Sequence, residues 1–311
     1  MSTRIVLDCD PGHDDAIAIL LALASPEVEL VAITTVAGNQ TLEKTTANAL
    51  RMLELAGRTD IPVYAGADAP ILRQRDVAAH VHGESGLDGP DLPPPGTTPR
   101  GEHAVAYLAD LYRGADKPVL VATGPLTNVG LLLATYPDAR PDRVVSMGGS
   151  IGEGNRTPAA EFNIWADPEA AQRTFTAGLD TTMVGLDVTH RALIRDEHTE
   201  RMRQAGRVGQ VVAELMDFYA LFHRARYPEL GGSPMHDPVC VAHLVDPTLL
   251  DVRDAVIDVD CTDGPSRGRT NVDVRGREHF GPPNAKAAVG IDGGRFADLV
   301  VERISALAAE A

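Results

Sequence analysis

The feature that most constrains the fold is a regular alternation of short apolar runs with longer stretches of helix-forming residues. Residues 4–8 (RIVLD) and 29–35 (ELVAITT) have the length and continuous apolar character of strands buried in a parallel sheet. Residues 14–25 and 41–57 begin with acids or a threonine, as helix N-termini do. The pattern continues with predicted strands at 117–122, 143–147 and 182–186 and predicted helices at 128–136 and 168–178. Strands separated by helices predict a mainly parallel, Rossmann-like open α/β sheet flanked by helices.

Two long segments rich in glycine and proline, 66–101 and 224–236, interrupt this rhythm. Loops of that length usually carry function or are disordered. Beyond them, apolar alternation at 256–260 and 270–274 predicts a small antiparallel extension, and a final helix is expected near the C-terminus. Because neither a linker nor an internal repeat stands out, we expect residues 1–311 to form a single domain.

Charge and composition exclude several classes of protein. The chain has 28 Lys and Arg against 44 Asp and Glu, a formal net charge of −16, which argues against a nucleic-acid polymer or an anionic membrane as partner. Hydrophobic residues make up 44% and charged residues 23%, as in ordinary globular proteins. Three cysteines do not indicate a disulfide framework, and neither a signal peptide nor a membrane span is recognisable, so we expect a cytoplasmic location.

An acidic cluster follows the first predicted strand. The sequence DCDPGHDDA places Asp8, Asp10, Asp14 and Asp15 within eight residues. In open α/β sheets ligands bind at the carboxyl ends of the strands, which is where these acids would lie. Four carboxylates this close repel one another, and a bound cation is the simplest compensation. Because all the candidate ligands are hard oxygens, Ca²⁺ or Mg²⁺ is favoured over zinc.

Other interpretations of this cluster fit less well. A helix N-cap accounts for one or two of the four acids, not for all of them. Phosphatases of the haloacid dehalogenase type also have D-x-D after their first strand, but Gly12 stands where their motif usually has Thr or Val. An EF-hand loop would need a glycine at its sixth position and a closing glutamate at its twelfth, and this segment has neither.

Further polar groups follow other predicted strands or lie in the long loops. Asn39 follows the second strand, and Thr123 follows the strand at 117–122, where its backbone carbonyl could complete a cation shell. The segment 148–155 (GGSIGEGN) is one residue off the dinucleotide-binding pattern and is not followed at once by a helix, so we reject that function. Alone, Asp237 is well explained as a helix N-cap before proline. The remaining candidates are Glu161 and Asn163 after that segment and His82 and His236 in the two long loops.

Taken together, these motifs resemble the inosine–uridine-preferring nucleoside hydrolases over nearly the whole chain. The matching segments, in chain order, are DCDPGHDDA, VAGN around Asn39, VHGESGLDG from Val81, TGPLTN from Thr123, MGGSIGEGNRTPAAEFN from Met147, and HDP from His236. The resemblance looks closest to the bacterial pyrimidine-preferring members. It implies a homo-oligomeric enzyme, a tetramer or a dimer, that hydrolyses ribonucleosides with one bound Ca²⁺.

The resemblance also implies roles for individual residues. The Ca²⁺ ligands would be Asp10, Asp15, the carbonyl of Thr123 and Asp237, and Asp10 would also be the general base. Asp8 would support this shell. His236 would be the acid for the leaving base. The expected substrate contacts are Asp14, Asn39 and Asn163 to the ribose diol or water, Asn155 and Glu161 to the 5′-hydroxyl, and His82, Met147, Phe162 and Tyr227 elsewhere in the site, with Phe222 as another candidate aromatic over the base.

The implied chemistry is consistent with these residue types. N-glycosidic hydrolysis passes through a ribosyl cation of oxocarbenium character, which an anionic site stabilises. Pyrimidine ribonucleosides such as uridine and cytidine are the favoured substrates, with inosine possible. Two alternatives remain at this point, a hydrolase of another N-riboside such as nicotinamide riboside, and a Ca²⁺-stabilised nucleoside-binding protein without turnover.

Overall fold

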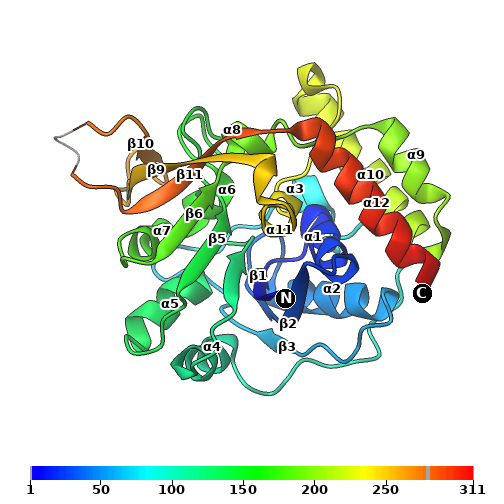
Figure 1. Ribbon diagram of the computed structural model, residues 1–311, viewed down its shortest axis with the longest axis horizontal. Coiled ribbons are helices and arrows are strands. Elements are labelled where there is room, and N and C mark those ends of the chain that lie inside the picture. The colour runs from blue at the N-terminus through cyan, green and yellow to red at the C-terminus, as the bar shows by residue number, and fades with distance from the viewer. Residues whose placement is uncertain (1, 278–280, 311) are drawn as a thin grey trace.

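A computed structural model describes residues 2–277 and 281–310 of the chain, and its central feature is a twisted sheet of nine strands (Figure 1). The strands of this sheet are β1 (Thr3–Cys9), β2 (Val28–Thr35), β3 (Val63–Ala65), β4 (Val119–Ala122), β5 (Arg143–Met147), β6 (Asp180–Val184), β9 (Leu250–Val259), β10 (Thr270–Asp273) and β11 (Ala285–Ile291). Their order is β10-β9-β11-β6-β5-β4-β1-β2-β3. A separate short pair consists of β7 (Leu193–Ile194) and β8 (Ser233–Pro234).

Parallel pairing runs from β3 through β2, β1, β4, β5 and β6 to β11. Among the described residues of this sheet, antiparallel pairing involves β9 alone, which pairs with both β11 and β10. The predicted fold class and its small antiparallel extension are therefore confirmed. The sequence did not reveal β11, which joins the extension to the parallel sheet.

Helices cover both faces of the sheet (Figure 1). The helices are α1 (His13–Ala24), α2 (Leu42–Leu55), α3 (Ala79–His82), α4 (Ala104–Arg113), α5 (Thr127–Thr135), α6 (Phe162–Ala166), α7 (Pro168–Phe175), α8 (Leu186–Thr189), α9 (Asp196–Arg203), α10 (Gly206–Arg226), α11 (Pro238–Val245) and α12 (Gly293–Glu310), with short 3-10 turns at Pro228–Leu230 and Pro247–Leu249. None of the helices in the described part of the chain is both long and apolar enough to cross a membrane.

Each face of the sheet has its own hydrophobic core, because successive side chains of a strand point to opposite faces. In β1, Ile5 and Leu7 join a core with α1, α2, α10, α11 and α12. Val6 joins the opposite core, which includes residues of α4, α5 and α7. Burial on both faces explains why the strand sequences are apolar runs rather than alternating patterns.

The strand order places a switch point between β1 and β4. From β1 the chain proceeds outward through β2 and β3, whereas β4, β5 and β6 extend the sheet in the other direction. At such a point the loops that follow the two adjacent strands diverge and leave a crevice, which is the usual ligand position in open α/β folds. Residues 10–12 follow β1 and residues 123–126 follow β4, so they border this crevice.

Candidate active site

Buried carboxylates form the floor of the crevice. Asp10 follows β1, whereas Asp14 and Asp15 lie in the first turn of α1, and none of the three is more than 4% exposed. Asp237 comes from the start of α11, far away in the sequence. Carboxylate oxygens of Asp14, Asp15 and Asp237 all lie within 4.8 Å of one another. The acids that the sequence grouped after the first strand thus meet an acid from the second long loop.

Hydrogen bonds from neighbouring strand ends hold two of these acids. The backbone N–H of Asn39 donates to Asp10 Oδ2 at 2.6 Å, and Asn39 Nδ2 donates to Asp15 Oδ2 at 3.1 Å. Thr123 Oγ1 donates to Asp15 Oδ1 at 2.8 Å. Close backbone approach is also required, since a Cβ at Gly38 would lie 2.1 Å from Asp10 Oδ2 and one at Gly124 would lie 2.7 Å from Asp10 Oδ1. Glycine at both positions therefore makes room for the Asp10 carboxylate.

Burial raises the pKa of every acid in this floor, and repulsion between carboxylates adds to the effect for Asp10, Asp14 and Asp237. Burial, followed by the charge of Asp15, raises the pKa of Asp14 to about 7 and that of Asp10 well above its usual value. Burial also raises the pKa of Asp15, against the hydrogen bonds from Gly12 and Thr123. For Asp237 the pKa lies well above the ordinary range because burial is reinforced by Asp14, Asp15 and Asp10.

This floor could hold a metal ion. Its donors are carboxylate oxygens together with the nearby carbonyl of Thr123, a donor set that suits a hard divalent cation. Asp237 occupies the N-cap position of α11 but its side chain makes no capping hydrogen bond, so the carboxylate is available to the cluster. The helix-cap explanation of Asp237 therefore does not describe its side chain.

A further buried acid lies beside the cluster. Asp8 Oδ1 accepts hydrogen bonds from Thr34 Oγ1 at 2.6 Å and from Asn128 Nδ2 at 2.7 Å. Among the described residues, Asp8 Oδ2 has no hydrogen-bond partner although it is buried. Burial raises the pKa of Asp8 to about 6. This acid carries charge at the back of the site without reaching the pocket itself.

A pocket opens above the floor and combines polar and aromatic walls. Most of the residues expected from the sequence line it: Asp14, Asn39, His82, Thr123, Met147, Asn155, Glu161, Phe162, Asn163, Phe222, Tyr227, His236 and Asp237. Asp8, Asp10 and Asp15 do not line the pocket, because they lie deeper and are almost completely buried. The structure thus brings the expected residues together in two layers.

The wall formed by the segment after β5 is built around Glu161. This carboxylate accepts backbone N–H bonds from Gly149 at 2.9 Å, Asn163 at 3.0 Å and Ile164 at 3.2 Å, and its position is the N-cap of α6. Burial raises the pKa of Glu161 to about 6 against these hydrogen bonds. Asn155 Oδ1 accepts from the backbone N–H of Phe162 at 2.9 Å. These contacts fix two polar side chains, those of Glu161 and Asn155, on one wall.

A second wall is a cluster of histidines and aromatic rings. The backbone N–H of His13 donates to His82 Nδ1 at 3.2 Å, which leaves Nε2 of His82 as the ring nitrogen that carries hydrogen. Nδ1 of His236 lies 2.8 Å from Thr189 Oγ1. Burial, with the neighbouring histidines, lowers the pKa values of His82 and His236 well below 6.5, so both rings are neutral at pH 7.

Several pocket residues were not expected from the sequence, namely Ala78, His80, Val81, Arg156, His190, Tyr219 and His223. Tyr219 and His223 are four residues apart on α10 and therefore share one helix face. Their ring centroids are 4.2 Å apart. The spacing was visible in the sequence, but only the packing of α10 shows that this face borders the pocket.

The fold and the site together define an open α/β enzyme with a metal-competent acidic site for a small ligand. A model of the inosine-uridine preferring nucleoside hydrolases matches residues 5–298. The chain belongs to this family and is a nucleoside hydrolase.

Relatives and solved structures agree with that assignment. The chain is 50% identical to a pyrimidine-specific ribonucleoside hydrolase RihA of Shewanella sp. (strain MR-7), over 98% of this chain and 97% of the relative. It is 49% identical to the protein of that name from Escherichia coli O127:H6, over 98% and 99% of the two chains. The structure of a purine-preferring ribonucleoside hydrolase from Gardnerella vaginalis matches with a TM-score of 0.93 at 36% identity, covering 99% and 100% of the chains.

Proposed function

We propose that this nucleoside hydrolase is Ca²⁺-dependent and cleaves the N-glycosidic bond of pyrimidine ribonucleosides, releasing ribose and the free base. The observation that carries the proposal is the division of the pocket into a carboxylate and amide floor and a histidine and aromatic wall. A ribose presents hydroxyl groups that suit the first surface, and a planar base suits the second. We further propose that residues 1–311 act as one domain.

Asp10, Asp15, Asp237 and the Thr123 carbonyl would hold the cation. This assignment is supported by the raised pKa values of the three acids, which a nearby positive charge would reverse. When bound, Ca²⁺ would supply Lewis-acid polarisation of the oxygen atoms that it coordinates. Ca²⁺ is preferred to Mg²⁺ because a cluster assembled from separate loops offers irregular rather than strictly octahedral geometry.

The floor residues have distinct proposed roles. Asp10 accepts the proton of the attacking water, and the Asn39 N–H at 2.6 Å holds its carboxylate in place. Asp14, Asn39 and Asn163 bind the ribose diol or the water. On the adjoining wall, Asn155 and Glu161 bind the 5′-hydroxyl. Asp8 adds negative charge behind the site, which favours the developing ribosyl cation.

The wall residues act on the base as it departs. His236, which is neutral and buried, donates a hydrogen bond or proton to the leaving base, and Thr189 fixes the orientation of its ring. His82 presents Nε2–H to the same region. Met147, Phe162, Phe222 and Tyr227 provide apolar and aromatic contact area. Uracil and cytosine can accept such hydrogen bonds through their carbonyl oxygens.

Base preference is the part of the proposal that needs the most direct test. Pyrimidine preference is supported by relatives named pyrimidine-specific at 50% and 49% identity, whereas the purine-preferring structure is 36% identical. The experiment is a measurement of kcat/KM for uridine, cytidine, inosine and adenosine in the presence of Ca²⁺. We expect uridine and cytidine to exceed both purine nucleosides. Higher values for inosine or adenosine would contradict the pyrimidine assignment.

We also propose that the enzyme is a cytoplasmic homo-oligomer, a tetramer or a dimer. Three cysteines without a disulfide among them fit a reducing compartment. Light scattering after size-exclusion chromatography would report the mass of the assembly directly. A monomer of 33.0 kDa at micromolar concentration would contradict the oligomer.

A further inference from the structure

The connection between β9 and β10, residues 260–269, contacts both loops that supply pocket residues. It lies in the antiparallel extension at one end of the sheet (Figure 1). Of the described residues that line the pocket, none belongs to this connection. Its contacts therefore reach the site only through other segments.

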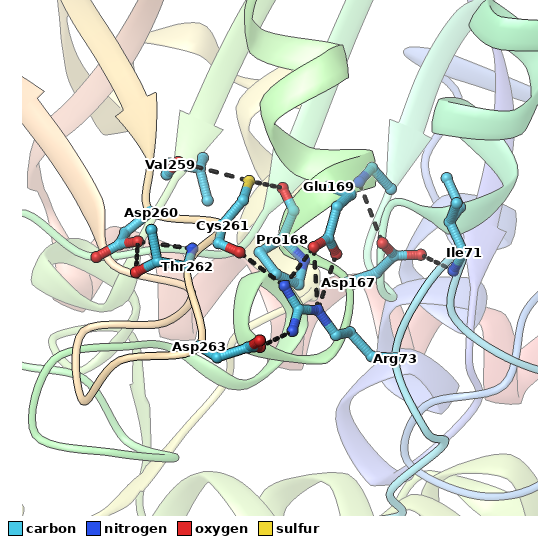
Figure 2. Close-up of polar contacts among 11 residues, drawn as sticks. Ile71, Arg73, Asp167, Pro168, Glu169, Val259, Asp260, Cys261, Thr262 and Asp263 are labelled. Atoms are coloured by element: carbon cyan, nitrogen blue, oxygen red, sulfur yellow. Dashed lines mark hydrogen bonds and ion pairs between the residues drawn. The ribbon is translucent and has the colours of Figure 1, made fainter.

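Arg73 forms the first of these contacts (Figure 2). Its Nε donates to both carboxylate oxygens of Glu169 at 3.0 and 3.2 Å, and its Nη2 donates to the backbone carbonyl of Cys261 at 2.7 Å. Nη1 pairs with Asp263. The side chains of Arg73 and Glu169 are only 16% and 18% exposed. A planar guanidinium that is held at every nitrogen has one orientation, which lysine could not reproduce.

This contact anchors a loop that has no regular secondary structure of its own. Residues 66–78 are irregular and lead directly into α3. Ala78 at the end of this segment and His80, Val81 and His82 in α3 line the pocket. Besides Arg73, its anchors include the Ile71 N–H bond to Asp167 Oδ2 at 2.9 Å. Among the described residues, the backbone–backbone hydrogen bonds of this loop lie at its two ends, at Gly66, Ala67 and Ala78, so its middle depends on side-chain anchors such as Arg73.

Arg269 forms the second contact, at the other end of the same connection. Its Nη1 donates to the carbonyl of Gly152 at 2.6 Å and its Nη2 to the carbonyl of Ile151 at 2.9 Å. Thr270 Oγ1 donates to the carbonyl of Ser150 at 2.6 Å. The anchored segment continues to Asn155, on the wall built around Glu161.

We propose that the β9–β10 connection positions both walls of the active site, and that the positioning residues are Arg269 of the connection and Arg73 of the 66–78 loop that binds it. Arg73 fixes the position of the loop that leads into α3, the helix that carries His80 and His82 towards the base. Arg269 fixes the position of the segment that carries Asn155 towards the ribose 5′-hydroxyl. The inference rests on the proposed function, because it uses the assignment of Asn155 and Glu161 to the 5′-hydroxyl.

The test compares Arg73→Met and Arg269→Met with uridine and 5′-deoxyuridine as substrates. Both variants should lower kcat/KM for uridine about tenfold or more, since small displacements of binding groups are costly. For Arg269→Met the loss should shrink to less than about threefold on 5′-deoxyuridine, which lacks the hydroxyl concerned. For Arg73→Met the loss should be the same on both substrates. Arg113→Met is the matched control, because Arg113 pairs with Asp138 on an exposed surface of α4.

If kcat/KM of both Arg73→Met and Arg269→Met matches that of the Arg113→Met control, the proposal is overturned. It is also overturned if Arg269→Met loses the same fraction of kcat/KM on uridine and on 5′-deoxyuridine. If Arg73→Met fails to fold, Glu169→Gln and Asp263→Asn remove single contacts of the same guanidinium and should give smaller losses of the same kind. Unchanged kinetics in both of these variants would also overturn it. A wild-type enzyme that hydrolyses no ribonucleoside would instead contradict the proposed function, and the two failures are thus distinguishable.

Discussion

If the acidic floor binds a cation as proposed, its removal should lower the thermal stability of this enzyme by an amount that can be calculated. The floor holds Asp10, Asp14, Asp15 and Asp237 in almost complete burial. Each has a raised pKa, so the folded chain without a cation carries an electrostatic cost that the unfolded chain does not. A cation that binds the folded state alone removes this cost and adds its binding free energy.

The size of the effect follows from linkage. Free Ca²⁺ at about 1,000 times its dissociation constant contributes about 4 kcal/mol to the free energy of unfolding. The unfolding entropy of 311 residues, at about 2.1 cal/mol/K per residue, is roughly 0.65 kcal/mol/K. The expected shift in Tm is therefore about 6 °C.

Differential scanning calorimetry with and without exhaustive EDTA treatment measures this shift. Added Ca²⁺ should restore both Tm and activity. In Asp237→Asn, the difference in Tm between the untreated and the EDTA-treated protein should be smaller than in the wild type. Asp91→Asn is the matched control, because Asp91 is exposed and lies outside the cluster. An unchanged Tm and unchanged activity after chelation would refute the reasoning that a metal ion compensates these acids.

Three further predictions concern individual side chains. Asp10→Asn should lower kcat by on the order of 10² or more, as loss of a general base does, and stopped assays of ribose release would detect near-wild-type turnover if Asp10 had another role. His236→Ala should reduce uridine hydrolysis more than hydrolysis of p-nitrophenyl riboside, whose leaving group needs no acid; equal losses would exclude that role. Burial lowers the pKa of His243 to about 4 from 6.5, so its contribution to stability is present above pH 6.5 and lost as the pH falls towards 4. Between pH 6.5 and pH 5, protonation of His243 in the unfolded chain lowers the free energy of unfolding by roughly 2 kcal/mol. His243→Gln should remove this pH dependence, as measured by denaturant titrations at several pH values. An unchanged pH slope in the variant would contradict the prediction.

Much of the sheet was predictable because most of its strands are short, continuous apolar runs in the sequence. Arg143–Met147 was predicted with the bounds that the structure shows, and β1 and β2 differ from their predicted ranges by one or two residues. β3 has only three residues, and β11 has the sequence AKAAVGI, in which alanine and glycine give little strand signal. Their pairing with β2, β6 and β9 determines these strands, and such long-range pairing leaves no local trace in the sequence.

The candidate site divides in the same way. The residues that follow strand ends, such as Asp10, Asn39 and Thr123, were predictable because parallel strands end at a common edge. Tyr219 and His223 were not, since their presence in the pocket depends on how α10 packs against α1 and α3. Asp237 is a third case. Its position before proline predicts a helix N-cap, but its side chain makes no capping hydrogen bond and lies in the acidic floor with Asp14 and Asp15.

The central claim is that a buried carboxylate floor and a bound cation act on the ribose diol during N-glycosidic hydrolysis. The most direct test is kcat/KM for uridine against 2′-deoxyuridine with Ca²⁺ present, measured as release of uracil. We expect the deoxynucleoside to react on the order of 10² times more slowly, because it lacks one of the two hydroxyls that orient the sugar. Equal rates for the two substrates, or no release of uracil from uridine, would contradict the account.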